Sequence, residues 1–447
     1  MVSAKTRKRR RRVLSGMRPT GPLHLGHYFG ALSNWVRMQE EYDCFYFVAD
    51  WHALTTHYAE DTRLVPQNTL AIALDWLSMG IDPEKSTLFV QSMVPEHAEL
   101  HLLLSMITPL EWLERVPTYK EQISQLRDKD LGTYGFLGYP LLQTADIVMY
   151  DADLVPVGED QVPHIELSRE VVRRFNSLFR VRVKDELFND LGAKWARELV
   201  MNALPSRRLL WAEFDWPKTE AVTPELPDPR RGYVMRPSES DFLAAVREVG
   251  ADNFLEKIGK AREYFDVRVP LHEPQAMLTE TPRFPGTDGR RMAKSYGNAI
   301  WLRDEPDAIR RKVLGMMTDP QRVRRTDPGR PEICPVFAYH QLFSPADMVA
   351  WAESGCRSAG IGCVECKRAM GENLVRWIEP VQERRKQFES DPDRVRQILE
   401  KGSKRAGRVA RGTMKRVREA IFGPAAAQTL RARTASKPAE PLWSESD

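Results

Sequence analysis

Apolar and polar segments alternate along the first half of the chain, and their spacing predicts strands and helices in turn. The apolar run at 44–49 (CFYFVA) is typical of a strand buried on both faces of a parallel sheet. Helical spacing of apolar positions marks the segment at 26–41, after a loop rich in glycine and proline at 16–25. Strands are expected at 12–15, 87–91 and 154–157, with helices at 61–79 and 160–174. This alternation predicts an α/β fold with a doubly wound parallel sheet.

The pattern changes after residue 183. Prolines at 205, 217, 224, 227, 229 and 237 interrupt residues 184–280, which predicts a small inserted domain followed by a return to the sheet. From about residue 307 the spacing is helical. The sequence after residue 422 is expected to be a disordered tail.

Composition narrows the class of protein. The chain has 447 residues, of which 42% are hydrophobic and 29% charged, as in ordinary globular proteins. No apolar run approaches the ~18 residues of a membrane span. No apolar segment of a secretory signal follows the basic N-terminus, and five cysteines argue against a disulfide scaffold. We therefore expect a cytoplasmic protein that makes no use of a membrane.

The net charge is only +4, but basic residues gather at two places. Residues 5–12 read KTRKRRRR, and a second cluster near the other end consists of Lys404, Arg405, Arg408, Arg411, Lys415, Arg416 and Arg418. Such blocks attract phosphate backbones through counterion release. A solvated tail and a solvated helix face remain the alternatives, and for the N-terminal run the two interpretations stay open.

Two histidines stand at the turn from the first strand to the first helix, in the sequence PTGPLHLGH at 19–27. His24 and His27 are three residues apart, so their imidazoles are expected to point to the same side. Gly26 between them lets a nucleotide approach the backbone, and the helix N-terminus adds free N–H groups. The pattern predicts a phosphate site, with two capping or surface histidines as the alternative.

A basic loop, GRRMAKS at 289–295, carries the second candidate chemistry. Its cations Arg290, Arg291 and Lys294, with the hydroxyl of Ser295, could close over nucleotide phosphates and stabilise a leaving pyrophosphate. Alone this is an ordinary basic loop. Paired with HxGH upstream, it indicates a nucleotide-dependent reaction.

HxGH followed by RMAKS resembles the two signatures of class I aminoacyl-tRNA synthetases, which usually read HIGH and KMSKS. Here Leu25 replaces Ile, while Arg291 and Ala293 replace the first Lys and the first Ser. Charge is retained at Arg291, and Lys294 stands at the second Lys. The resemblance implies these catalytic residues: His24, His27, Arg291, Lys294 and Ser295.

Further stretches, YPLLQTAD at 139–146, VPVGEDQ at 155–161 and HIEL at 164–167, look like the tryptophan-specific members of that family. The resemblance implies that Asp146 accepts a hydrogen bond from the indole N–H, and that Tyr139 and Gln161 bind the substrate amino group. Together with His52 and Gln143 they would form the tryptophan pocket. The implied ATP-binding residues are Arg18, Thr20, Gly26, His27, Gly158, Asp160, Met292 and Lys294.

Gln143 favours an alternative, because tryptophan enzymes of bacteria commonly have Met there. Tyr139, Gln143 and Asp146 also fit the YxxxQxxD pattern of tyrosine-specific members, and a buried aspartate can accept from an indole N–H or a phenol O–H. VPVGEDQ with HIEL is the tryptophan-type version, and GSDQW of the tyrosine enzymes is absent. A nucleotidyltransferase without tRNA and a non-catalytic RNA-binding paralogue are further alternatives, disfavoured by the long basic helical region and by the two signatures.

Four of the five cysteines, Cys334, Cys356, Cys363 and Cys366, have the spacing C-x21-C-x6-C-x2-C. Four thiolates suit tetrahedral zinc or a [4Fe–4S] cluster, whereas scattered buried thiols are the plain alternative. Some tryptophan-specific members carry a [4Fe–4S] cluster around the sequence GCVDCK, which GCVECK at 362–367 resembles. We therefore favour the cluster over zinc, and we expect Cys44 to lie in the core.

The resemblance implies an ATP-dependent ligase that uses Mg²⁺ and charges tRNA(Trp) with L-tryptophan, as a homodimer with residues 97–121 near the interface. The expected organisation is a basic extension at 1–12, a Rossmann-type catalytic domain at 13–183 and an insertion without assigned role at 184–275. The catalytic domain would return at 276–310, followed by a helical anticodon-binding domain with the four cysteines at 311–424 and a tail at 425–447.

Overall fold

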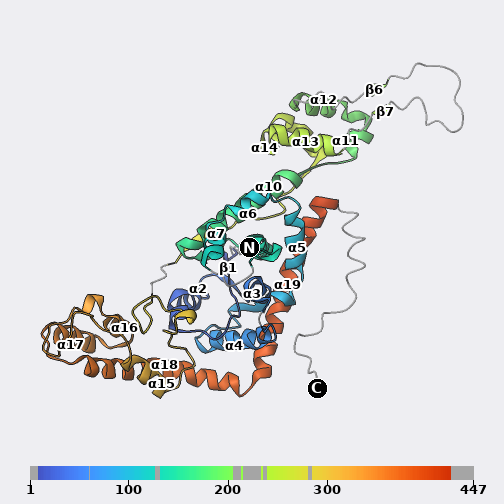
Figure 1. Ribbon diagram of the computed structural model, residues 1–447. Helices are drawn as coiled ribbons and strands as arrows, with labels where there is room; N and C mark the ends of the chain where they lie inside the picture. The colour runs from blue at the N-terminus through green and yellow to red at the C-terminus, as the bar shows by residue number, and fades with distance from the viewer. Residues whose placement is uncertain are drawn as a thin grey trace, which may run out of the picture.

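The computed structural model describes residues 9–59, 61–125, 131–204, 213–214, 233–234, 239–279 and 284–423. Its centre is a five-stranded sheet in the order β3-β2-β1-β4-β9 (Figure 1). The strands are β1 (Arg12–Met17), β2 (Asp43–Val48), β3 (Ser86–Val90), β4 (Leu154–Val157) and β9 (Gln275–Leu278). All four neighbouring pairs are parallel, so the predicted α/β sheet is confirmed.

The strand order reverses between β1 and β4, since the chain builds β2 and β3 on one side of β1 and β4 and β9 on the other. In open α/β sheets, ligands bind at the carboxyl ends of the strands at such a reversal. The structure therefore places the expected ligand site beside the ends of β1 and β4.

Side chains alternate across the sheet and feed two cores, because successive residues of a strand point to opposite faces. Cys44 and Tyr46 of β2 pack on one face, where Trp35 stacks on Tyr46 with ring centroids 4.4 Å apart. Phe45 and Phe47 pack on the other face. Cys44 is fully buried, as expected.

Helices cover both faces. The predicted helix at 26–41 is divided into α1 (Leu25–His27), a π-helical turn (Tyr28–Leu32) and α2 (Ser33–Met38). Those that follow up to residue 179 are α3 (Asp50–His57), α4 (Leu64–Ser78), α5 (Glu96–Ser105), α6 (Leu110–Glu114), α7 (Pro117–Gln125), α8 (Tyr134–Leu137), α9 (Tyr139–Met149) and α10 (Val162–Phe179).

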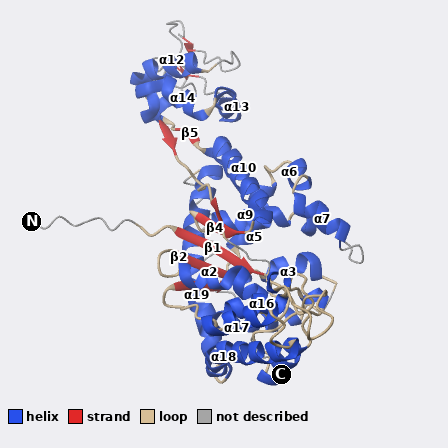
Figure 2. Cartoon of the chain, turned by 90° about the vertical axis from the view of Figure 1, so that its left-hand side faces the viewer, coloured by secondary structure: helices blue, strands red, loops and turns tan. Residues whose placement is uncertain are grey.

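A small module projects from the end of α10 (Figure 1; Figure 2). Antiparallel β5 (Val181–Val183) and β8 (Phe265–Val267) form its base. It has its own apolar core, in which Phe242, Phe254 and Phe265 are in mutual ring contact. Its helices are α11 (Glu186–Asn189), α12 (Lys194–Ala203), α13 (Glu239–Val249) and α14 (Ala251–Ile258), and a short pair consists of β6 (Glu213–Phe214) and β7 (Tyr233–Val234). The six interrupting prolines lie outside the described residues.

The C-terminal part is helical, as predicted. Its helices are α15 (Pro306–Leu314), α16 (Pro335–Phe343), α17 (Ala346–Arg357), α18 (Cys363–Glu389) and α19 (Pro392–Phe422). The 31-residue α19 runs back along β3 and α5 of the sheet domain (Figure 1). Gly402 allows this close approach, because an added Cβ would lie 1.7 Å from the carbonyl oxygen of Leu88.

The basic cluster on α19 is used largely within the chain. Its ion pairs with the sheet domain include Arg405–Asp43, Arg416–Asp151 and Arg418–Glu99. In the N-terminal run, Arg12 pairs with Asp43 at 2.8 Å, whereas residues 1–8 lie outside the described part, as does the predicted tail at 425–447. None of the described helices has the length and apolar character required to cross a membrane.

Candidate active site

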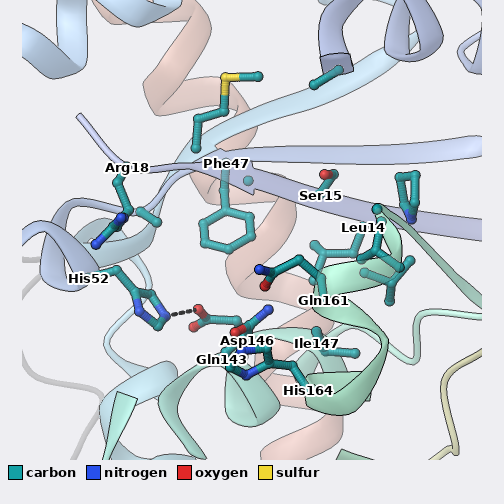
Figure 3. Close-up of a pocket in the computed structure, with 18 of the residues that line it drawn as sticks. Leu14, Ser15, Arg18, Phe47, His52, Gln143, Asp146, Ile147, Gln161 and His164 are labelled. Atoms are coloured by element: carbon teal, nitrogen blue, oxygen red, sulfur yellow. Dashed lines mark hydrogen bonds and ion pairs between the residues drawn. The ribbon is translucent and has the colours of Figure 1, made fainter. Parts of the chain in front are cut away.

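A cavity of about 420 Å³ opens where the strand order reverses, between the carboxyl ends of β1 and β4 (Figure 3). Its walls come from β1, the segment around α2, α3, α9 and the loop after β4. All five residues predicted for the tryptophan pocket line it, namely His52, Tyr139, Gln143, Asp146 and Gln161. The fold thus gathers residues that lie up to 109 positions apart in the sequence, from His52 to Gln161.

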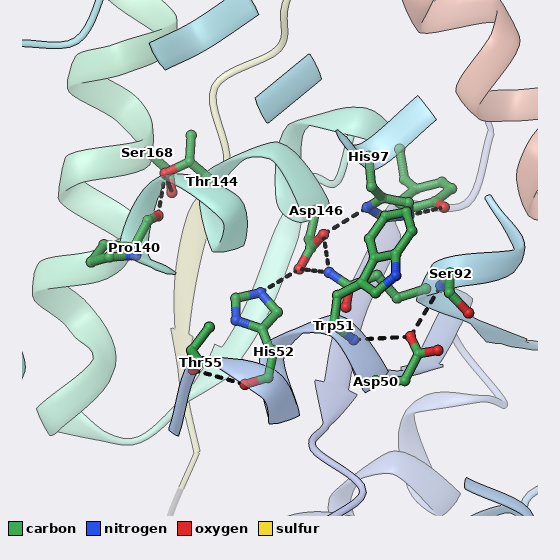
Figure 4. A network of polar contacts seen from close by, with 12 residues as sticks. Asp50, Trp51, His52, Thr55, Ser92, His97, Pro140, Thr144, Asp146 and Ser168 are labelled. Carbon is green, nitrogen blue, oxygen red and sulfur yellow. Dashed lines mark hydrogen bonds and ion pairs between the residues drawn. The ribbon is translucent and has the colours of Figure 1, made fainter. Parts of the chain in front are cut away.

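Asp146 lies deep in the wall of this cavity, with only 1% of its surface exposed. Its carboxylate contacts His52 Nε2 at 2.8 Å, His97 Nδ1 at 2.6 Å and Gln91 Nε2 at 2.8 and 3.0 Å (Figure 4). Burial alone would raise the pKa of this carboxyl, but His97 and His52 outweigh it and lower the pKa to about 2. Asp146 is therefore an ionised acceptor at neutral pH.

Three members of this network were not predicted from the sequence. Gln91 directly follows β3, His97 lies in the first turn of α5, and Tyr150 follows α9 with its hydroxyl 2.7 Å from His97 Nε2. A polar residue directly after a buried strand is the signal that could have marked Gln91, since the carboxyl ends of parallel strands share one edge.

Tyr139 is held by a second chain of hydrogen bonds. Its hydroxyl lies 2.8 Å from Thr118 Oγ1, which lies 2.7 Å from His164 Nε2. Burial lowers the pKa of His164 to about 4 and raises that of Tyr139. Both side chains are therefore neutral at pH 7 and contribute hydrogen bonds to the cavity.

The two histidines of the first signature lie side by side, as predicted, with ring centroids 3.8 Å apart. The backbone N–H of His24 donates to His27 Nδ1 at 3.1 Å. Burial, aided by Lys294 and Arg291, lowers the pKa of His24 to about 4. Burial, aided by the same cations and by His24, lowers that of His27 to about 2. Both imidazoles are therefore neutral.

The second signature contacts the first across 267 positions from His27 to Lys294. Lys294 Nζ donates to the carbonyl of Gly21 at 2.9 Å, and the backbone N–H of Leu25 donates to the carbonyl of Ile300 at 3.0 Å. An added Cβ at Gly26 would lie 3.0 Å from the His24 ring and 3.4 Å from Met292 Cβ, so a larger residue would push on the His24 ring.

The predicted ATP-binding residues lie in the cavity, at the two signature loops and, in the case of Asp160, at the surface. Arg18 and Gly158 line the cavity. Gly26, His27, Met292 and Lys294 lie where the two signature loops meet, and Thr20 lies in the turn beside Gly21. Asp160 is exposed, does not line the cavity and accepts from Gln161 Nε2 at 2.9 Å. Arg291 and Ser295 are also exposed, on the outer side of the second loop.

A buried ion pair ties the first signature to the C-terminal helices. Asp75 of α4 accepts from the backbone N–H of Leu23 at 3.1 Å and pairs with Arg385 of α18. Burial raises the pKa of Asp75 to about 6, although Arg385 opposes this shift. This pair could not be predicted from the sequence, since a lone aspartate on one helix gives no sign of its distant partner.

The four predicted cysteine ligands lie around the starts and ends of helices in the C-terminal part. Cys334 precedes α16, Cys356 lies near the end of α17, and Cys363 and Cys366 open α18. Burial and the other three thiols raise the pKa of Cys366 to about 12. Among the described residues, however, no three histidine, cysteine, aspartate or glutamate side chains are grouped so that they could hold a metal ion. The expected metal centre is therefore not seen as a preformed site.

Comparison with known proteins gives one consistent result. The family of class I tRNA synthetases for tryptophan and tyrosine (W and Y) matches residues 5–191 and 248–378. The tryptophan–tRNA ligase of Ralstonia nicotianae is 49% identical over 92% of this chain and 98% of its own length. That of Thermotoga maritima is 43% identical over 92% of this chain and 98% of its own length.

A solved structure agrees with the sequence relatives. The tryptophanyl-tRNA synthetase of Campylobacter jejuni, in complex with ADP and tryptophan, superposes with a TM-score of 0.66 at 26% identity. The match covers 92% of this chain and 99% of that one. The relatives thus favour tryptophan over the tyrosine alternative that Gln143 suggested. The chain therefore belongs to the class I tRNA synthetases for tryptophan and tyrosine, and within them to the tryptophan–tRNA ligases.

Proposed function

We propose that the cavity beside β1 and β4 holds L-tryptophan and that the two signature loops hold ATP next to it. The observation that carries this proposal is the convergence of His52, Tyr139, Gln143, Asp146 and Gln161 on one cavity. In this assignment the ionised Asp146 accepts the indole N–H, while Tyr139 and Gln161 bind the amino group. Arg18 and Gly158 line the side of the cavity that faces the nucleotide.

In the first step the tryptophan carboxylate attacks the α-phosphorus of ATP. A carboxylate O–P bond forms, the bond to the bridging oxygen breaks, and pyrophosphate leaves with the electron pair. This reaction needs no protein nucleophile, because positioning and charge stabilisation lower the barrier. His24 and His27, being neutral, stabilise the transferring phosphate through hydrogen bonds, and Lys294 and Arg291 stabilise the pyrophosphate. Bound Mg²⁺ would neutralise phosphate charge.

In the second step a ribose hydroxyl of the terminal adenosine of tRNA(Trp) attacks the activated carbonyl. An ester forms and AMP leaves. We assign anticodon binding to the C-terminal helices. Of these, α18 reaches from the cysteine region to the Asp75–Arg385 pair, so it links this part of the chain to the first signature.

Amino-acid-dependent exchange of pyrophosphate into ATP tests the activation step. Tryptophan and tyrosine are run side by side at equal concentration with wild-type protein and with Asp146→Ala. We expect exchange with tryptophan only, and a strongly raised KM for tryptophan in the variant. Exchange with tyrosine alone, or an unchanged KM in Asp146→Ala, would contradict the assignment of the cavity.

We also propose that Cys334, Cys356, Cys363 and Cys366 hold a [4Fe–4S] cluster, with zinc as the alternative. What supports this is the donor set: four thiols that act on one another electrostatically, with Arg322 Nη1 lying 3.8 Å from Cys356 Sγ as a compensating cation. Such a group would brace the ends of α16, α17 and α18. Thiols with raised pKa values release protons when they ligate, so binding should weaken at low pH.

Anaerobically purified protein tests this site by its iron, sulfide and zinc content and its visible spectrum. We expect a brown protein with iron and sulfide, and loss of both in Cys363→Ser. Colourless protein with stoichiometric zinc would replace the cluster by the alternative. The absence of both metals would overturn the site, and Cys44→Ser is the matched control that leaves metal content unchanged.

We propose, finally, that the chain is a homodimer. The family resemblance places the 97–121 segment near the interface. Its exposed apolar side chains include Leu102 of α5, Met106 directly after α5, and Leu110 of α6. Burying them against a second copy would remove apolar surface from water.

A further inference from the structure

Three donor nitrogens already contact the two oxygens of the buried Asp146 carboxylate. A carboxylate offers about four acceptor positions. Oδ1 accepts from Gln91 Nε2 at 2.8 Å and contacts His97 Nδ1 at 2.6 Å. Oδ2 contacts His52 Nε2 at 2.8 Å and Gln91 Nε2 at 3.0 Å. An indole N–H that enters the cavity therefore competes with the donor that already contacts the carboxylate on that side.

Only one of the three donors faces the cavity. His52 lines it, whereas Gln91 and His97 are fully buried behind the carboxylate and do not. The close-up views agree: His52 approaches Asp146 within the cavity in Figure 3, and His97 reaches the carboxylate from another side in Figure 4. The position held by His52 is thus the one that a ligand in the cavity can take.

The buried side is fixed by a chain of donors. His97 Nε2 lies 2.7 Å from the hydroxyl of Tyr150, which is also fully buried. An ionised carboxylate can only accept, so the contact requires a proton on His97 Nδ1, which is donated to Asp146. The Tyr150 hydroxyl at Nε2 holds the imidazole ring in the orientation that this hydrogen bond needs.

We infer that Gln91, His97 and Tyr150 are positioning residues that hold Asp146 ready, and that the indole N–H exchanges with His52 at Oδ2. This inference rests on the proposed use of the cavity for tryptophan. His52 acts as a placeholder, because each lost hydrogen bond to a buried carboxylate is costly, even though Gln91 and His97 keep theirs. The exchange replaces one hydrogen bond by another, so a ligand without an N–H at that place loses a bond that the substrate keeps.

The charged and titratable groups around Asp146 support the same arrangement. His52 and His97 contact it, His101 and Tyr150 also feel its charge, and Glu96 acts on Tyr150. Burial raises the pKa of Asp146, and the two histidines reverse this shift. Loss of the His97 contact should therefore raise the pKa of the carboxyl and weaken tryptophan binding at acid pH.

The test compares tryptophan with 3-(benzothiophen-3-yl)alanine, which has sulfur in place of the indole N–H. The readout is the ratio of kcat/KM for the two amino acids in pyrophosphate exchange. We expect wild-type protein to prefer tryptophan strongly. The ratio should fall about 10-fold or more in His97→Gln, which loses the hydrogen bond to the charged carboxylate, and in Tyr150→Phe, which loses the hydrogen bond that holds His97. The fall should grow as the pH is lowered.

Two further variants keep the inference falsifiable. Tyr46→Phe is the matched control, because it removes an equally buried hydroxyl that donates to the carbonyl of Trp35, and its ratio should equal that of the wild type. In His52→Ala the ratio should rise, because the donor that faces the cavity at Oδ2 is removed and only the buried Gln91 contact remains there. If His52 merely packed against the substrate, its replacement by alanine should not raise the ratio.

The outcomes separate this inference from the proposed function. Unchanged ratios in His97→Gln and Tyr150→Phe, or a lower ratio in His52→Ala, would overturn the exchange while wild-type activation of tryptophan still stands. Wild-type protein that fails to activate tryptophan would overturn both. Should His97→Gln fail to fold, the isosteric Tyr150→Phe and the His52→Ala ratio decide.

Discussion

The two histidines of the first signature are partly removed from water and carry no charge. His24 and His27 have pKa values lowered to about 4 and about 2, so they stay uncharged through the physiological range. Neutral imidazoles can donate a hydrogen bond to a phosphate without adding charge. The positive charge that stabilises the leaving pyrophosphate must then come from Lys294 and Arg291.

Removal of either kind of group should slow activation. We expect His27→Ala and Lys294→Ala to lower kcat for tryptophan-dependent exchange by ~10²–10³, the usual loss for a group that stabilises charge in a transition state. Arg290→Ala is the matched control, because Arg290 pairs with Asp288 and stacks on Tyr296 in the same loop. Activation at the wild-type rate in either test variant would sink the phosphate assignment.

The pH dependence of ATP use should report Lys294. Burial, aided by Arg18 and opposed by Asp75, lowers the pKa of its ammonium to about 8. A cation with a lowered pKa loses its charge as the pH rises through that value, so kcat/KM for ATP should fall above about pH 8. In Lys294→Arg the decrease in kcat/KM for ATP should move to higher pH. A decrease at the same pH as in the wild type would assign the titration to another group.

At the scale of elements, α19 joins the C-terminal helices to the sheet domain. It lies directly on β3 at Gly402, and ion pairs such as Arg418–Glu99 follow along its length. The basic residues that the sequence offered as a phosphate-binding cluster therefore serve, in good part, to fasten this helix. Charge patterning alone could not reveal this, because Asp43, Asp151 and Glu99 lie more than 260 positions away.

The close approach of α19 to β3 gives a clear stability test. In Gly402→Ala the new Cβ would lie 1.7 Å from the Leu88 carbonyl oxygen, so helix and strand must separate. We expect a loss of about 1–3 kcal/mol, measured as a lower midpoint in thermal unfolding. Gly412→Ala on the same helix meets nothing within 4 Å and should leave the midpoint unchanged or raise it. Equal midpoints for both variants would contradict the packing.

At the scale of the whole molecule, the exposed apolar side chains of α5 and the segment up to α6 bear on assembly. Met106 is 72% exposed and Leu110 is 61% exposed. We predict that Met106→Glu with Leu110→Glu converts a dimer to a monomer in light scattering. Val269→Glu, at an equally exposed apolar position after β8, should remain dimeric. A wild-type chain that is already monomeric would refute the proposed homodimer.

How much could be predicted from the sequence differs between fold and site. The parallel sheet followed from apolar runs such as 44–49, because burial on both faces leaves a continuous apolar strand. The gathering of His52, Asp146 and Gln161 was expected from motifs and is seen in one cavity. Gln91, His97 and Asp75 were missed, since their importance arises from partners that only the folded chain brings near. The π-helical turn at Tyr28–Leu32 was missed because it keeps a helical pattern.

An aminoacylation assay tests whether this chain charges tRNA(Trp) with tryptophan. Purified full-length protein is given ATP, Mg²⁺, and transcripts of tRNA(Trp) or tRNA(Tyr), with labelled tryptophan or tyrosine. We expect ester formation for tryptophan with tRNA(Trp) alone. Charging of tRNA(Tyr) with tyrosine, or no charging by folded protein that activates neither amino acid, would contradict this expectation.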